Sequence, residues 1–263
     1  MQLFGETAGS TGSILWIRKC VPNAMTLLAL GAGSFSICMA VEGQFETAIA
    51  YILLAAVLDT VDGHVARRLS AASKFGAELD SLANLVNFGV APALLLYLWA
   101  SPAPDYVGWW AVILFVFCTA LRLARFNARA EDESRQDGAT SYFEGVPAPA
   151  AALIVLLPFY LSKLLAPGQV VPVAIIMIHL ITVGLLMISR LPTFSSKHIA
   201  DYFAGSIPLP LTIAGASGGL VLLLAVPWLV LIVGCATYIA TIGPSYFLHK
   251  RQMLAEPDVE LPD

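Results

Sequence analysis

Three carboxylates between Leu58 and Ala93 of a very apolar chain are the side chains of this sequence best suited to chemistry: Asp59, Asp62 and Asp80. An unpaired carboxylate inside a membrane costs roughly a few kcal/mol, so such groups face a polar cavity and a positive partner. Mg²⁺ and Mn²⁺ prefer oxygen ligands and usually complete their coordination with water and substrate phosphates. The three side chains therefore predict a divalent metal site that receives a phosphate group.

The spacing of these residues predicts that they meet across a pair of helices. Asp59 and Asp62 lie three residues apart, and Gly76, Asp80 and Asn84 follow one another at intervals of four. Residues at i, i+3 and i+4 share one face of a helix. Two antiparallel helices joined by the short segment LSAAS would therefore point two oxygen-bearing faces at each other.

A purely structural alternative is that Asp59 and Asp62 pair with Arg67 and Arg68 where a helix meets the membrane surface. That arrangement would suffice for a single carboxylate. It leaves Asp80 and the amide on the second helix unexplained, so we favour the metal site.

Composition identifies a protein embedded in a membrane. Of its 263 residues 58% are hydrophobic and 12% charged, and the mean hydropathy is +0.80, outside the range of soluble globular proteins. The predicted fold class is all-α, a polytopic transmembrane helix bundle with about eight spans, each near the roughly 20 residues that cross a bilayer. A six-span core followed by a C-terminal hairpin fits the same pattern. The predicted spans are 23–41, 45–66, 76–100, 108–128, 147–166, 170–190, 206–225 and 227–248.

The distribution of basic residues predicts the orientation of the spans. Lys and Arg collect in cytoplasmic loops, and with the N-terminus in the cytoplasm all of the 14 Lys and Arg residues except Lys163 fall on that side. We therefore expect both termini and the acidic cluster at the cytoplasmic face of the inner membrane. The chain is predicted to be one domain, 1–263, with a cytoplasmic or interfacial N-terminus (1–20), an extra hairpin (206–248) and a tail (250–263). The 4 Cys and 4 His residues lack the spacing of a ligand set, and no nucleic-acid partner is expected.

The acidic run as a whole, DTVDGHVARRLSAASKFGAELDSLAN, resembles the signature of the CDP-alcohol phosphotransferases. That signature is D-x-x-D-G-x-x-A-R, then eight residues, then G-x-x-x-D-x-x-x-D. The last signature Asp is replaced by Asn84 in this chain. ELDSLANLVNFGVAPA, LRLARFNA, YFEGVPAPAAA and SRLPTFSSK further resemble segments of bacterial membrane-spanning phosphatidylserine synthases, so the likeness runs from about residue 20 to 200. The matching signature positions are Asp59, Asp62, Gly63, Ala66, Arg67, Gly76 and Asp80.

This resemblance implies a reaction in which the hydroxyl of L-serine attacks CDP-diacylglycerol, giving phosphatidylserine and CMP. It implies two divalent cations, Mg²⁺ or Mn²⁺, held by the carboxylates with Asn84, and it implies a homodimer in membrane lipid. Two metals that clamp the attacking and leaving oxygens suit such a displacement. Asn23 and Thr26 resemble a family element near the nucleotide, although they could equally cap an ordinary helix start. The expected nucleotide and diphosphate residues are Asn23, Thr26, Asp59, Gly63, Ala66, Arg67 and Gly76.

Asn84 occupies the position at which the family has its expected general base. An amide does not accept a proton at ordinary pH, and loss of a general base typically costs ~10²–10⁴-fold in rate. Its carbonyl oxygen can still bind a metal or a hydrogen-bond donor. We therefore expect this chain to bind CDP-diacylglycerol and to turn it over slowly, with an engineered Asp-to-Asn exchange favoured over a natural replacement.

Selection of serine requires a cation for its carboxylate. Arg122 and Arg125 share a face near the cytoplasmic end of the fourth predicted span, and Arg190 and Lys197 form a second basic cluster. Guanidinium binds carboxylate or phosphate through two hydrogen bonds. Lipid phosphate is an equally good ligand, and each of these residues could instead be a charge that only sets topology. Three further polar residues could meet the serine ammonium or line the cavity: Asn127, Glu144 and Asn87.

Other functions remain open at this point. Within the family the acceptor could be inositol, glycerol phosphate or choline. A non-catalytic lipid-nucleotide binder is compatible with Asn84. A transporter would place its acidic groups near the bilayer midplane, whereas these lie beside Arg67, Arg68 and Lys74.

Overall fold

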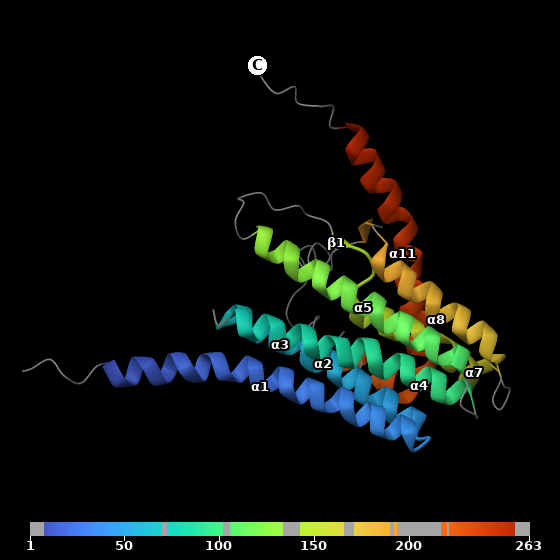
Figure 1. The fold of residues 1–263 in the computed structure, drawn as a ribbon, viewed down its shortest axis with the longest axis horizontal. Helices are drawn as coiled ribbons and strands as arrows, with labels where there is room; N and C mark the ends of the chain where they lie inside the picture. The colour runs from blue at the N-terminus through green and yellow to red at the C-terminus, as the bar shows by residue number, and fades with distance from the viewer. Residues whose placement is uncertain are drawn as a thin grey trace, which may run out of the picture. The chain divides into compact units, whose positions relative to one another are not determined.

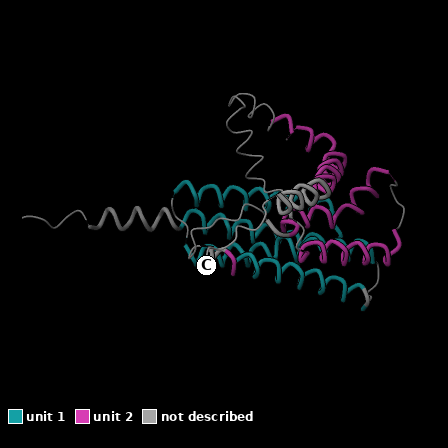
Figure 2. Tube along the Cα trace, turned by 90° about the horizontal axis from the view of Figure 1, so that it is seen from above, with its two compact units in different colours: residues 1–127 teal, residues 128–263 magenta. Residues whose placement is uncertain are grey.

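The computed structural model of the chain describes residues 8–69, 73–101, 106–133, 143–165, 171–189, 192–193, 217–219 and 221–255. The chain divides into two compact units, residues 1–127 and 128–263 (Figure 2). The described residues are helical apart from turns and a two-residue strand pair, which confirms the all-α membrane fold class. The prediction of a single domain stays a prediction.

Unit 1 is a bundle of helices in which α1 packs along α2 and against α3, η1 and α4 (Figure 1). A tight turn with Gly43 at φ 77° reverses the chain after α1. The π-helical turn η1 connects α3 to α4, so the three form one continuous membrane span, Lys74–Ala100. The elements that begin in this unit are α1 (Ala8–Val41), α2 (Phe45–Arg68), α3 (Lys74–Asn84), η1 (Leu85–Val90), α4 (Ala91–Ala100) and α5 (Tyr106–Glu133).

Unit 2 contains a short antiparallel pairing of β1 with β2, which places Phe143 opposite Thr193. Gly145 follows β1 at φ 81°, and a Cβ at this position would meet the Met187 carbonyl oxygen at 2.5 Å. Glycine is therefore required where the chain passes the end of α8. The elements are β1 (Phe143–Glu144), α6 (Ala148–Val155), α7 (Leu157–Leu165), α8 (Val173–Ile188), β2 (Pro192–Thr193) and α11 (Pro227–Ala255).

Most predicted spans coincide with helices in the described part of the chain. Among the residues that the structure describes, five helices are long and apolar enough to cross a membrane, or up to six if a bent pair counts as one span. The sixth predicted span corresponds to α8, which has 16 residues. The seventh, 206–225, falls largely outside the described residues, and the last corresponds to α11. The bent pair is Ser217–Ala225 with Pro227–Thr241, and the bend between them is 119°. The count of eight and the side on which each terminus lies stay predictions. The five are Cys20–Val41, Phe45–Arg68, Lys74–Ala100, Gly108–Arg129 and Ala148–Leu165.

The fifth span is interrupted where α6 gives way to α7. Pro158 has no N–H, so it cannot donate to the carbonyl of Ile154 four residues earlier. His179 of α8 supplies the missing donor, because its Nε2 lies 2.9 Å from the Ile154 oxygen. No role for this histidine was predicted from the sequence, and in the structure its hydrogen bond satisfies a carbonyl at the helix break.

We expect His179→Leu to lower the free energy of unfolding by about 1 kcal/mol, because the Ile154 carbonyl loses the hydrogen bond from His179. In a Pro158→Ala background the same substitution should cost much less, since the backbone N–H restored at position 158 can reach that carbonyl. Unfolding in detergent by denaturant titration measures both. Equal costs in the two backgrounds would show that the His179 hydrogen bond does not repair the break.

Candidate active site

The centre of the candidate site is a group of three carboxylates contributed by two helices of unit 1. Asp59 and Asp62 come from α2 and Asp80 from α3, and one carboxylate oxygen of each lies within 4.8 Å of the others. Asp62 is only 4% exposed, and the other two are half-buried. Like charges this close repel one another strongly unless a cation lies between them. An all-oxygen donor set of this kind fits Mg²⁺ or Mn²⁺.

Local interactions of the two helices fix these carboxylates. Thr26 of α1 donates its hydroxyl hydrogen to Asp62 Oδ2 over 2.8 Å, and both residues are buried. Ser73 caps the start of α3, because its Oγ accepts a hydrogen bond of 3.1 Å from the Gly76 amide. This cap sets the first residue of α3 and hence the face on which Asp80 lies.

Asn84 completes the oxygen-bearing face of α3. Its side chain is a hydrogen-bonding neighbour of both Asp59 and Asp80. Its Oδ1 is buried and has no hydrogen-bond partner within the part of the chain that the structure describes. A buried carbonyl oxygen without a partner costs about 1–3 kcal/mol. A cation beside the carboxylates would be a suitable partner, so the amide fits a metal site even though it does not fit a base.

The expected nucleotide residues lie around the same end of α2 and α3. A Cβ at Gly76 would meet Asn23 Oδ1 at 3.0 Å, so the Asn23 side chain of α1 packs against α3 here. A Cβ at Gly63 would meet the Arg67 guanidinium at 3.5 Å, which places this cation over the glycine. Ala66 is half-buried on α2.

The helix-cap alternative for Asn23 and Thr26 is wrong. Helix α1 runs without a break from Ala8 to Val41, so both residues lie in its interior. Thr26 instead bonds Asp62, and Asn23 lies beside Gly76. The polar pair at the predicted start of the span therefore faces the acidic cluster.

Of the four cations predicted to bind serine or lipid phosphate, the structure describes Arg122 and Arg125. Arg122 and Arg125 are half-buried on α5. Asn127 Nδ2 on the same helix donates to Ser81 Oγ over 2.9 Å, which joins α5 to the residue after Asp80. Sequence reasoning missed Ser81, because an isolated serine on a helix carries no distinctive signal.

The remaining polar residues considered from the sequence are described only in part. Glu144 belongs to β1 of unit 2, and only its backbone is described. Asn87 is completely buried in η1. Arg190 and Lys197 lie outside the described residues.

Comparison with known proteins agrees with the signature. A model of the CDP-alcohol phosphatidyltransferase family matches residues 19–188. A CDP-diacylglycerol–serine O-phosphatidyltransferase of Mycobacterium leprae is 38% identical over 243 residues, covering 91% of this chain and 78% of the relative. The protein of the same name from Mycobacterium bovis is 37% identical over 260 residues, with coverage of 98% and 87%. An archaetidylserine synthase of Methanothermobacter thermautotrophicus is 35% identical over 166 residues, with coverage of 60% and 66%.

Metal binding should change the effect of Asp80→Asn on stability. In EDTA we expect the variant to be at least as stable as the native chain, because one repelling charge is gone. With Mn²⁺ at about 100 times the native dissociation constant, the native chain should gain about 2.7 kcal/mol and the variant much less.

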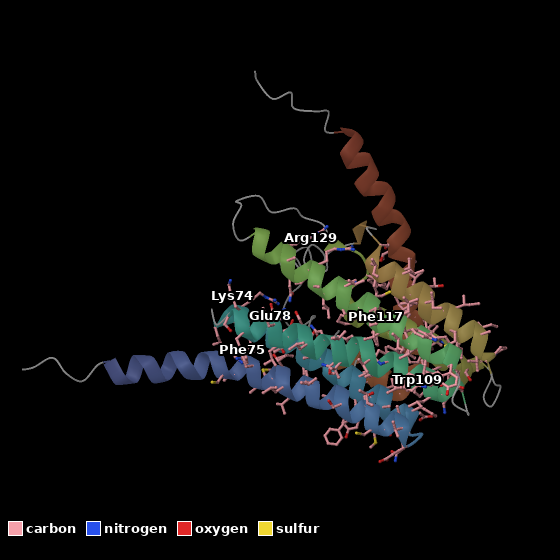
Figure 3. All side chains as sticks on the ribbon, viewed as in Figure 1. Lys74, Phe75, Glu78, Trp109, Phe117 and Arg129 are labelled. Atoms are coloured by element: carbon pink, nitrogen blue, oxygen red, sulfur yellow. The ribbon has the colours of Figure 1, made fainter. Side chains whose placement is uncertain are left out.

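Thermal unfolding with and without Mn²⁺ measures this difference. Glu78→Gln is the matched control, because Glu78 is an exposed carboxylate on the same helix and lies outside the cluster (Figure 3). An equal gain from Mn²⁺ in Asp80→Asn and in the native chain would contradict a metal site at the cluster.

Proposed function

The chain belongs to the CDP-alcohol phosphatidyltransferase family, and we propose that it transfers the phosphatidyl group of CDP-diacylglycerol to L-serine. The products are phosphatidylserine and CMP. The observation that carries the proposal is the carboxylate cluster of α2 and α3, with oxygens within 4.8 Å, inside the segment matched by the family. Serine is supported as acceptor by the names of the relatives, which denote serine enzymes.

The reaction forms one bond to phosphorus and breaks another. The serine hydroxyl oxygen attacks the phosphorus next to diacylglycerol, and CMP leaves with the electron pair of the broken P–O bond. Two divalent cations, when bound, hold the diphosphate and neutralise the charge that develops on the leaving oxygen. The proton of the serine hydroxyl must pass to a base.

The residues of this chain supply the binding and positioning. Asp59, Asp62 and Asp80 would hold the cations, with Thr26 keeping the Asp62 carboxylate in place. Gly76 would let the nucleotide approach the helix backbone, because a side chain at this position would crowd Asn23.

Arg67 and Gly63 would complete the diphosphate and nucleotide contacts. The Arg67 guanidinium lies over Gly63, where it would offer charge to a phosphate. Ala66, a small residue on the same helix, would line the nucleotide side with them.

For the serine carboxylate we propose Arg122 and Arg125 of α5, with Arg190 and Lys197 as further cations for serine or lipid phosphate. The hydrogen bond of Asn127 to Ser81 supports this role of α5, because it brings the helix next to Asp80. An inositol, glycerol phosphate or choline acceptor is the alternative within the family.

We also propose that the site faces the cytoplasm at the inner membrane. Basic residues Arg67, Arg68 and Lys74 flank the acidic cluster, and Trp109 lies at the opposite end of unit 1 (Figure 3). Lys and Arg favour the cytoplasmic side, and Trp favours a membrane interface. A homodimer is proposed on the resemblance alone.

The amide at position 84 supports the proposal that the chain binds CDP-diacylglycerol but turns it over slowly or not at all. This holds whether Asn84 is an engineered exchange or a natural replacement, because an amide does not accept a proton in either case. A non-catalytic binder of the lipid nucleotide is therefore the second candidate function.

Asn84→Asp should raise the rate of CMP release with L-serine by about 10²–10⁴-fold, because a proton acceptor is restored. The assay uses CDP-diacylglycerol with Mn²⁺ or Mg²⁺ and offers serine, inositol, glycerol 3-phosphate and choline in turn. Gln44→Glu, which adds a carboxylate at an exposed turn, should leave the rate unchanged.

Each result of this assay has a distinct meaning. If CMP release by Asn84→Asp is stimulated by another of the alcohols and not by serine, that alcohol is the acceptor. If neither form releases CMP with any alcohol while CDP-diacylglycerol still binds, the chain is a binder and the transferase proposal is wrong.

Gly76→Ala should weaken CDP binding in the presence of Mn²⁺ by about tenfold or more, because the added methyl lies 3.0 Å from Asn23 Oδ1 and fills the space of the nucleotide. Gly31→Ala on α1 is the control, since a Cβ there meets no atom within 4 Å. Titration calorimetry of both variants gives the affinities. Unchanged CDP affinity in a folded Gly76→Ala protein would exclude this face as the nucleotide site.

A further inference from the structure

Asn87 is a buried amide that neither the fold nor the carboxylate cluster accounts for. It lies in η1 with 0% exposure, and neither its Oδ1 nor its Nδ2 has a hydrogen-bond partner among the residues described. Helix α1 passes so close that a Cβ on Gly33 would overlap the Asn87 carboxamide. The amide is therefore held at the interface of α1 and η1 by a glycine that leaves room for it.

A second polar group of the same kind lies on α1. Ser36 is also 0% exposed, and its Oγ has no partner within the described ranges. It follows Gly33 by three residues, so the two share a helix face. Buried polar groups are nearly always hydrogen-bonded, so two groups that are not require an explanation. The π-helical geometry of η1 favours a ligand as the explanation, since π-helical turns occur frequently at functional sites.

The position of Asn87 limits which part of a substrate could reach it. It follows Asp80 by seven residues along the continuous span Lys74–Ala100. At a rise of 1.5 Å per residue, Asn87 lies roughly 10 Å deeper in the span than Asp80. A lipid whose diphosphate binds the carboxylate cluster would have its glycerol and ester groups at this depth.

The hydrogen-bonding chemistry of Asn87 and Ser36 favours the ester groups of the lipid as their partners. An amide N–H and a hydroxyl O–H are neutral donors, which suit the carbonyl oxygen of a fatty-acid ester. An ether-linked lipid lacks that carbonyl and leaves the donors unpaired. A site built to hydrogen-bond a substrate group discriminates against the analogue that lacks it.

We propose that Asn87, with Ser36 as a second donor, binds an ester carbonyl of the diacylglycerol part of the substrate and selects ester-linked over ether-linked CDP-lipids. This inference rests on the proposed function, because it takes the diphosphate to lie at the carboxylate cluster. It assigns to the interface of α1 and η1 a role in lipid recognition that is separate from the nucleotide and the acceptor alcohol.

The test compares the affinities of CDP-diacylglycerol and its dialkyl ether analogue for the full chain with Mn²⁺. The protein is placed in nanodiscs of ether-linked carrier lipid, so that the substrate is the only source of ester carbonyls. The native chain should bind the ester about three- to tenfold more tightly, the contribution of one or two hydrogen bonds. Asn87→Ala should lose most of this preference, because only Ser36 remains as a donor, and should bind CDP, which has no lipid part, as the native chain does.

Thr119→Val is the matched control, because Thr119 is an equally buried hydroxyl of unit 1 that already donates to the Phe115 carbonyl. It should keep the native preference for the ester. If Asn87→Ala does not fold, Asn87→Leu, which is similar in size and apolar, carries the same expectation.

Three results would overturn the inference or its premise, and they are distinguishable. No ester preference in the native chain, or the native preference retained in Asn87→Ala, makes the amide a structural or water-binding group. Failure of the native chain to bind CDP or either lipid contradicts the proposed function itself.

Discussion

Electrostatic repulsion among three carboxylates is the constraint on which the rest of unit 1 depends. Asp59, Asp62 and Asp80 hold oxygens within 4.8 Å of one another in a protein that is 58% hydrophobic. Without a compensating cation such a group would favour separation of α2 from α3. The packing of α1 along both helices opposes that separation, because it buries the Asp62 carboxylate against Thr26. The fold thus pre-forms a site whose charge only a strongly positive partner can balance.

The same packing brings α1 against α3 and against η1, at two depths of the span. At Gly76 the Asn23 side chain of α1 lies against α3, and at Gly33 the missing side chain leaves room for the Asn87 amide. Small residues permit such contacts between membrane helices. A lipid nucleotide bound along this interface would meet charge at the carboxylates and neutral donors further into the span.

The spacing of residues in the sequence was sufficient to predict which side chains share a helix face. It was insufficient to predict the contacts from other helices that hold those faces in place. The intervals of three and four residues predicted that Asp59 and Asp62 meet Asp80, and the structure brings these three side chains together. The continuation of α1 through Asn23 was not predicted, because nothing in the local sequence distinguishes a span that starts at the membrane from a helix that begins earlier. The hydrogen bond of His179 to Ile154 joins residues 25 apart in the chain, and such tertiary pairings leave no periodic signal.

The measurement that tests the central claim most directly is electron–nuclear double resonance of Mn²⁺ bound to the native chain in the presence of CDP-diacylglycerol. If the carboxylate cluster holds the metal that binds the diphosphate, the spectrum will contain ³¹P couplings of directly coordinated phosphate, and Asp80→Asn will weaken or abolish them. Lipid binding without any ³¹P coupling to Mn²⁺ would contradict the account.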